Sequence, residues 1–276
     1  MKKIIIALDG DHFPRGAFEF AKFINNQNEI LLAGIFLTPV DYAKLMSYTS
    51  IVEGVTVMPD WDIKGDDDEV VNHNIELFED ACLSSGLQYR IHKEEDITAL
   101  SSLVEETRFA DLLLVSSELF FKNVAEKQPN YYLEELLKRT ECPVMLVPEL
   151  FKTPQQILLS YDGGESSMFA IKQFTYLFPE LSNMETILLS VNDDNPVALP
   201  ESGMVTELLT KHYNNLRLQN IKMPNRKSYV EWLATQPESY IVMGAFARSM
   251  LSELFKKSFA KDIIRDIKMP IFISHK

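Results

Sequence analysis

The segment that decides the fold is Lys3–Gly10, KIIIALDG, which recurs later in the chain as Gln156–Gly163, QILLSYDG. In both copies an apolar run stops at Asp-Gly, which predicts a buried strand followed by a tight turn. Apolar residues at helical spacing follow each turn: Ala17, Phe20, Ala21 and Ile24 in the first copy, and Ala170, Phe174 and Leu177 in the second. The repeated unit is therefore strand, tight turn, amphipathic helix.

The two copies match again near their ends. Asp111–Val115 corresponds to Ser239–Met243, and Cys142–Val147 corresponds to Met269–Ser274. The first copy is longer by roughly 26 residues, and insertions of this kind in repeats map to loops. We place the extra residues in the interval 37–68, after the second strand of the first copy.

Strands alternate with helices in each half, which predicts a parallel sheet covered on both faces. The predicted helices are 69–85, 97–109 and 131–140 in the first copy, and 204–215, 227–235 and 251–267 in the second; strands are predicted at 29–36, 88–92 and 186–191. We expect an α/β fold of two tandem, doubly wound, five-stranded parallel sheets. The domains are 1–150, with the insertion near 37–68, and 154–276, with the boundary at Thr153-Pro154.

Composition excludes several classes of protein. The net charge of −13 makes the average surface repel nucleic acids and anionic membranes. With two cysteines and no C-x-x-C pair, a disulfide scaffold and a cysteine zinc site are excluded, and a reducing cytoplasm is favoured. No apolar run reaches the roughly 18 residues of a membrane span. The acidic run 66–69 precedes a predicted helix. We interpret these carboxylates as favourable contacts with the positive end of the helix dipole, in preference to a site for a divalent cation.

Ligands of an open parallel sheet bind beyond the carboxyl ends of its strands, where strand order reverses. Asp9 and Asp162 end the two first strands, and a carboxylate there can accept from a ribose hydroxyl or a base amino group. The alternative is that each Asp caps the turn or helix that follows. A second candidate is the loop 243–248, together with the run 256–259 into the last helix.

These features together resemble the universal stress protein family: the repeat, the strand ending in Asp-Gly, the strand-Gly loop, and the closing helix before x-Pro-hydrophobic. The chain looks like two fused copies, and the resemblance covers almost all of it apart from the insertion. It implies a Rossmann-like fold, related to adenine-nucleotide-binding folds, in each half. It also implies that the halves pack on each other as a pseudo-dimer.

Family members that bind ATP carry Gly, two residues, Gly, nine residues, then Gly-Ser or Gly-Thr. The resemblance places Gly244, Ala247, Lys257 and Ser258 at these positions, beside Asp162 and Gly163. Glycines let backbone amides approach phosphates, and lysine does not readily take positive φ. Lysine does attract phosphate, so the substitution weakens the family's mode of binding without forbidding an anion.

The first copy departs further from this motif. Ser116 and Leu119 stand at the first two glycine positions, residues near Asn130-Tyr131 replace the Gly-Ser pair, and Glu118 adds a negative charge. We therefore expect the first copy not to bind ATP, and Asp9 is the weaker of the two Asp candidates.

No catalytic residues are predicted, because the chain lacks a P-loop, a nucleophile elbow and a zincin motif. Lys256, Lys257, Lys261 and Arg265 could form a basic patch with Arg248. We expect a cytoplasmic, non-catalytic protein with a stress-response or interaction role, and homo-oligomers are possible. The alternative is a sensor that binds ATP or AMP through the second half, with slow ATP hydrolysis. The insertion could cover the first crevice, dock a partner or complete a local hydrophobic cluster.

Overall fold

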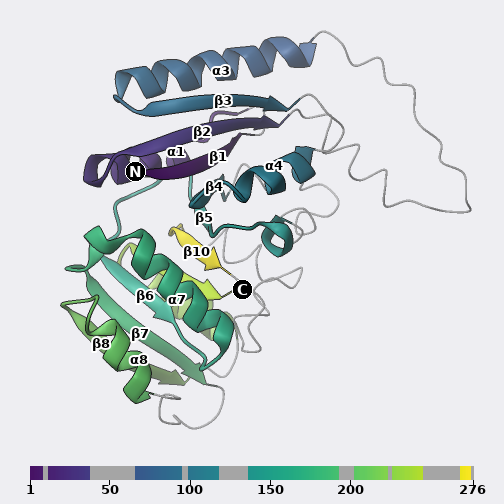
Figure 1. Ribbon diagram of the computed structural model, residues 1–276. Coiled ribbons are helices and arrows are strands. Elements are labelled where there is room, and N and C mark those ends of the chain that lie inside the picture. Colours follow the sequence, from purple (N-terminus) through teal and green to yellow (C-terminus); the bar gives the residue numbers. More distant parts are fainter. Residues whose placement is uncertain are drawn as a thin grey trace, which may run out of the picture.

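The computed structural model describes residues 1–8, 12–37, 66–94, 99–117, 136–192, 202–222, 226–244 and 268–274 (Figure 1). The elements of the first half are β1 (Lys2–Leu8), α1 (Arg15–Gln27), β2 (Ile30–Leu37), α3 (Asp66–Ser84), β3 (Gln88–Glu94), α4 (Ala99–Thr107), β4 (Leu112–Ser116) and β5 (Val144–Val147). Those of the second half are β6 (Gln156–Ser160), α7 (Glu165–Leu177), a 3-10 turn (Pro179–Leu181), β7 (Glu185–Asn192), α8 (Ser202–Leu209), β8 (Leu216–Lys222), α9 (Arg226–Ala234), β9 (Ser239–Gly244) and β10 (Ile271–Ser274).

The strands form one ten-stranded sheet in the order β3-β2-β1-β4-β5-β10-β9-β6-β7-β8. Within each half all pairs are parallel, and the strand order reverses beside the first strand of that half. The predicted α/β fold with parallel, doubly wound sheets is confirmed. The two sheets are not separate, because β10 pairs antiparallel with β5, as Phe272 opposite Met145 illustrates.

Helices cover both faces of this sheet. Strand residues alternate between two buried clusters, so that Ile4 and Ile6 pack on one face and Ile5 on the other. The first cluster includes side chains of α1, α3, α7 and α8, and the second includes side chains of α4 and α9. Each cluster runs through both halves, so the halves share their core.

Aromatic side chains fill the seam between the halves. The ring of Phe20 on α1 lies 6.4 Å from that of Phe178, 6.2 Å from that of Tyr240 and 5.5 Å from that of Phe151. Lys2 reaches across the seam as well, with its Nζ 3.1 Å from Glu180 Oε1. The seam is therefore packed like a protein interior.

Helix limits differ from the sequence predictions mainly in the second half. α8 ends at Leu209 instead of residue 215, because the chain turns there and enters β8 at Leu216. α3 begins at Asp66, three residues earlier than predicted, so the acidic run forms its first turn instead of preceding it. Carboxylates are favourable there because of the helix dipole. The predicted helix 251–267 and the first half of 131–140 lie outside the described residues, as does most of the predicted insertion.

Buried thiols make the stability of this fold sensitive to alkaline pH. Burial raises the pKa of Cys82 and of Cys142 from 9.0 to about 12. Between these values the unfolded chain loses thiol protons that the folded chain keeps, so we expect stability to fall as pH rises from about 9 to 12. Urea unfolding at stepped pH values tests this; unchanged midpoints from pH 8 to 11 would show that the thiols are not shielded.

Candidate functional site

The turn that joins β6 to α7 is built around Asp162. Its Oδ1 accepts a hydrogen bond from the Gly164 N–H at 2.8 Å and another from the Ser167 hydroxyl at 2.6 Å. Gly164 is the N-cap residue of α7 and has no side chain to satisfy the helix's first N–H groups. Between them Gly163 takes φ +80°, a left-handed conformation that favours glycine. The Asp162 carboxylate therefore organises the start of α7.

Removing this carboxylate is expected to weaken the fold even without ligand. Asp162→Ala should lower the free energy of unfolding by about 1.5–3 kcal/mol, the usual range for hydrogen bonds to a charged group. Asp162→Asn keeps an oxygen acceptor and should lose less. Chemical unfolding of both variants tests this, and an alanine variant as stable as the native chain would mean that the turn does not depend on Asp162.

Gly244, at the end of β9, lies directly against the first turn of α7. A Cβ at this position would be 2.6 Å from the Ser166 carbonyl oxygen and 2.7 Å from the Ser167 nitrogen. These are backbone atoms, which cannot rotate away. Glycine is therefore needed here for the close approach of β9 to α7, with or without a role in phosphate binding.

Three of the predicted binding residues are thus brought together at the start of α7. Asp162, Gly163 and Gly244 meet around Ser166 and Ser167. The other predicted positions, namely Asp9, Ala247, Lys257 and Ser258, lie outside the described residues, as does the predicted basic patch.

The corresponding place in the first half holds a carboxylate. Ser116 ends β4, at the position that matches Gly244, and its hydroxyl donates to Glu149 Oε1 at 2.6 Å. Ser116 is buried, and Glu149 follows β5 closely. A carboxylate that binds Ser116 therefore lies at the carboxyl ends of β4 and β5, the place that corresponds to the Gly244 turn of the second half.

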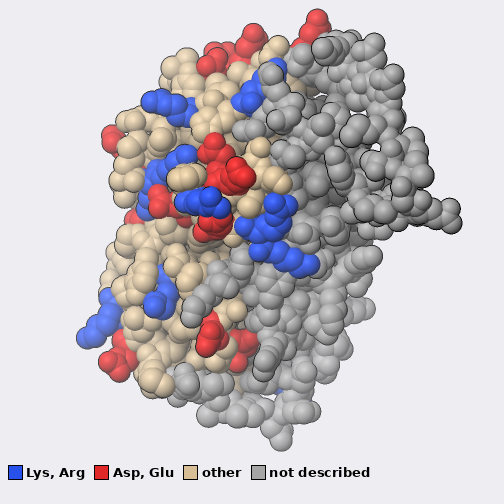
Figure 2. All heavy atoms as spheres, turned by 45° about the vertical axis from the view of Figure 1, so that its right-hand side comes forward, with Lys and Arg blue, Asp and Glu red and all other residues tan. Residues whose placement is uncertain are grey.

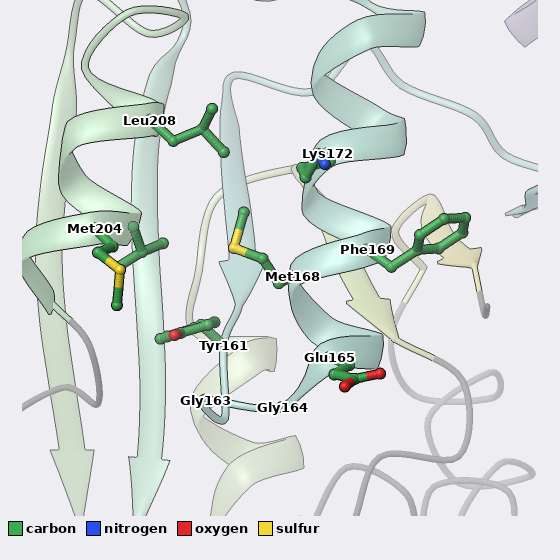
Figure 3. A pocket seen from close by; sticks show the side chains of 10 residues that line it. Tyr161, Gly163, Gly164, Glu165, Met168, Phe169, Lys172, Met204 and Leu208 are labelled. Carbon is green, nitrogen blue, oxygen red and sulfur yellow. The ribbon is translucent and has the colours of Figure 1, made fainter.

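A cleft of about 660 Å³ opens between α7 and α8, beside the Asp162 turn. It is lined by Tyr161, Gly163, Gly164, Glu165, Met168, Phe169, Lys172, Met204, Val205 and Leu208. In Figure 3, Met168 and Leu208 point into the gap between the two helices, and Tyr161 lies at its lower end. The lining is mostly apolar, with one carboxylate and one ammonium group.

Charges on the face drawn in Figure 2 are mixed, with Lys and Arg interspersed among Asp and Glu over the described residues. Ion pairs among the described residues include Arg108 with Glu141 at 2.7 Å and Lys152 with Glu238 at 2.8 Å. Among the described residues, no group of three or more His, Cys, Asp or Glu could hold a metal ion.

Comparison with known proteins points to one fold. No family model matches the sequence. A universal stress protein of Archaeoglobus fulgidus superposes with a TM-score of 0.62 and 12% identity, over 100% of this chain and 96% of that one. This chain has the universal stress protein fold. A Pseudomonas aeruginosa protein, provisionally described as a universal stress protein, gives a TM-score of 0.52 and 11% identity over 100% of this chain and 93% of its own.

The sequence resemblance to universal stress proteins is confirmed by a curated relative as well. A universal stress protein of Synechocystis is 22% identical over 141 residues, which are 50% of this chain and 49% of that relative. The match thus spans about half the length of that universal stress protein.

Sequence reasoning missed the α7–α8 cleft of this universal stress protein fold. Met204 and Leu208 were placed on a predicted helix, but nothing in their spacing distinguishes a side chain facing a cleft from one facing the core. The cleft is indicated instead by an exposed large apolar residue, Met204, which is 64% exposed. That exposure can be read only from the structure.

In the described part of the chain, no helix combines the length and the apolar character needed to cross a membrane.

Proposed function

We propose that this protein is a non-catalytic universal stress protein that acts through a stress-response or interaction role, with no tight nucleotide binding. One observation carries the proposal: the Asp162 carboxylate already holds the Gly164 N–H and the Ser167 hydroxyl at the start of α7. Gly244, which the family motif assigns to phosphate, is accounted for by its contact with Ser166. Asp162 and Gly244 thus each have a structural role that does not require a nucleotide.

The first half supports the same proposal. Glu149 accepts from Ser116 at the carboxyl end of β4, where the family's phosphate loop begins. Ser116 stands where the motif has its first glycine, and its buried hydroxyl is already bound to this carboxylate. We infer that the first half does not bind ATP.

The two cysteines bear on the compartment and on one kind of catalytic group, a cysteine nucleophile. Cys82 and Cys142 are free and buried, and burial raises the pKa of each to about 12, so neither presents a thiolate near neutral pH. Free thiols also suit a reducing compartment. We include a cytoplasmic location in the proposal on this ground.

A second candidate is a sensor of ATP or AMP in the second half, with weak ATPase activity. The observation that favours it is that Gly163 and Gly164 border the cleft at the carboxyl end of β6, where open α/β sheets bind ligands. Lys257 and Ser258 would supply the phosphate contacts in this case.

Equilibrium dialysis with ATP and with AMP separates the two candidates. We expect no saturable binding of either nucleotide below millimolar concentration. Saturable binding at micromolar concentration would replace our proposal with the sensor. Variants then show which half of the chain binds the nucleotide. For a sensor in the second half, Asp162→Asn weakens nucleotide binding and Asp9→Asn does not.

A further inference from the structure

The cleft between α7 and α8 has a lining that fits a particular class of ligand. We propose that it binds an amphiphilic monoanion, a molecule with an apolar chain and a single carboxylate. This inference goes beyond the proposed function, because most of the ligand-holding side chains come from α7 and α8, with Tyr161 beside them (Figure 3). The Asp162 side chain is not part of this lining.

Apolar side chains from both helices form the walls and the floor. Met168 and Leu208 face each other across the gap, and Tyr161 lies at one end of it. Tyr161 and Val205, which both line the cleft, are each 3% exposed. Met204 is 64% exposed, so a bound apolar chain would remove its surface from water, which is favourable. Methionine side chains are flexible and adapt to chains of varied shape.

Lys172 supplies the charge that selects an anion. It lines the cleft from α7 and has no ion pair among the described residues, unlike Lys2, Lys22 and Lys152, which each pair with a glutamate. A ligand carboxylate can therefore approach its ammonium group without displacing a partner.

Lys172 also gives the ligand a direction. It is the one basic side chain among the described residues that line this cleft, so the ligand's carboxylate belongs at the Lys172 end and its apolar chain beside Met168, Met204 and Leu208. A triphosphate fits this lining less well, because a single lysine does not balance its several negative charges.

The size of the cleft suits a small molecule. Its volume of about 660 Å³ lies within the range of about 300–1,000 Å³ that is typical of ligand pockets. A mostly apolar lining with a few polar groups is also typical of such pockets.

The first half lacks this lining. When the buried Ala17 of α1 is aligned with the buried Ala170 of α7, Met168 and Lys172 correspond to Arg15 and Glu19. Glu19 pairs with Lys22 at 2.8 Å, so the matching position carries the opposite charge. The lining is specific to the second half, and α1 provides a matched control.

Isothermal titration of the full-length protein with decanoate, below its micelle concentration, tests the proposal. We expect saturable binding with a negative heat-capacity change. Lys172→Gln should weaken decanoate binding about two- to five-fold, as expected for an exposed ion pair. Met204→Asp should weaken it roughly ten-fold, because it removes apolar contact and adds a repelling charge. Lys22→Gln on α1 should change nothing.

Decyltrimethylammonium, with the same chain and the opposite charge, serves as the counter-probe and should bind more weakly than decanoate. Equal binding of the two probes, or no saturable decanoate binding, would overturn the proposal, as would full affinity in Met204→Asp. Because decanoate contains neither base nor phosphate, this result is independent of the ATP dialysis, and either proposal can fail alone.

Discussion

Replacing Phe20 with alanine is expected to lower the free energy of unfolding by about 3–5 kcal/mol, the range for deleting a buried phenylalanine. Phe20 is 1% exposed and its ring contacts Phe151, Phe178 and Tyr240. Since it belongs to α1 of the first half and Tyr240 to β9 of the second, the cavity would open in the seam. Loss of Phe20 should therefore loosen both halves together.

Urea unfolding followed by fluorescence and by circular dichroism measures this effect. Phe109→Ala is the matched control, because Phe109 is 68% exposed and its loss should change stability by less than about 0.5 kcal/mol. If Phe20→Ala cost no more than Phe109→Ala, the shared core described for the two halves would be wrong.

Gly244→Ala is expected to destabilise the protein by about 1–3 kcal/mol in the absence of any nucleotide, the usual cost of overpacking. The added methyl would meet the backbone of Ser166 and Ser167, so β9 and the start of α7 would have to separate. A glycine kept only for phosphate binding would show no such loss in the free protein.

Gly203→Ala provides the control for this substitution. Gly203 lies on α8 and a Cβ there would have nothing within 4 Å, so alanine should leave stability unchanged or raise it slightly through helix propensity. Thermal unfolding of both variants makes the comparison. If both were as stable as the native chain, the tight packing of β9 against α7 would be disproved.

The fold was predictable because local sequence patterns, an apolar run followed by Asp-Gly in each copy, indicate a buried strand and a tight turn. The apolar run Ile4–Leu8 is buried and parallel to its neighbours, as its composition predicted. The antiparallel pairing of β5 with β10 was not predictable. Both strands are short, apolar and fully buried, so their sequences indicate burial but not a partner. The partner depends on how the two halves pack against each other.

The candidate site was only partly predictable, for a different reason. The sequence placed Asp162 at the end of the first strand of the second half, but it left two uses open, a ligand contact or a cap. The distances of 2.6 and 2.8 Å from Asp162 Oδ1 to its two donors support the cap. The cleft required the structure, since Met168 and Leu208 approach each other from helices that are far apart in the sequence.

Nuclear magnetic resonance titration of the labelled full-length protein with ATP tests the central claim most directly. The amide signals of Gly163, Gly164 and Gly244 report on the turn and on the strand end beside it. Our account predicts that these signals do not shift in a saturable way as ATP rises to millimolar concentration. Saturable shifts of all three at micromolar ATP would contradict it, and would show that the start of α7 is a nucleotide site.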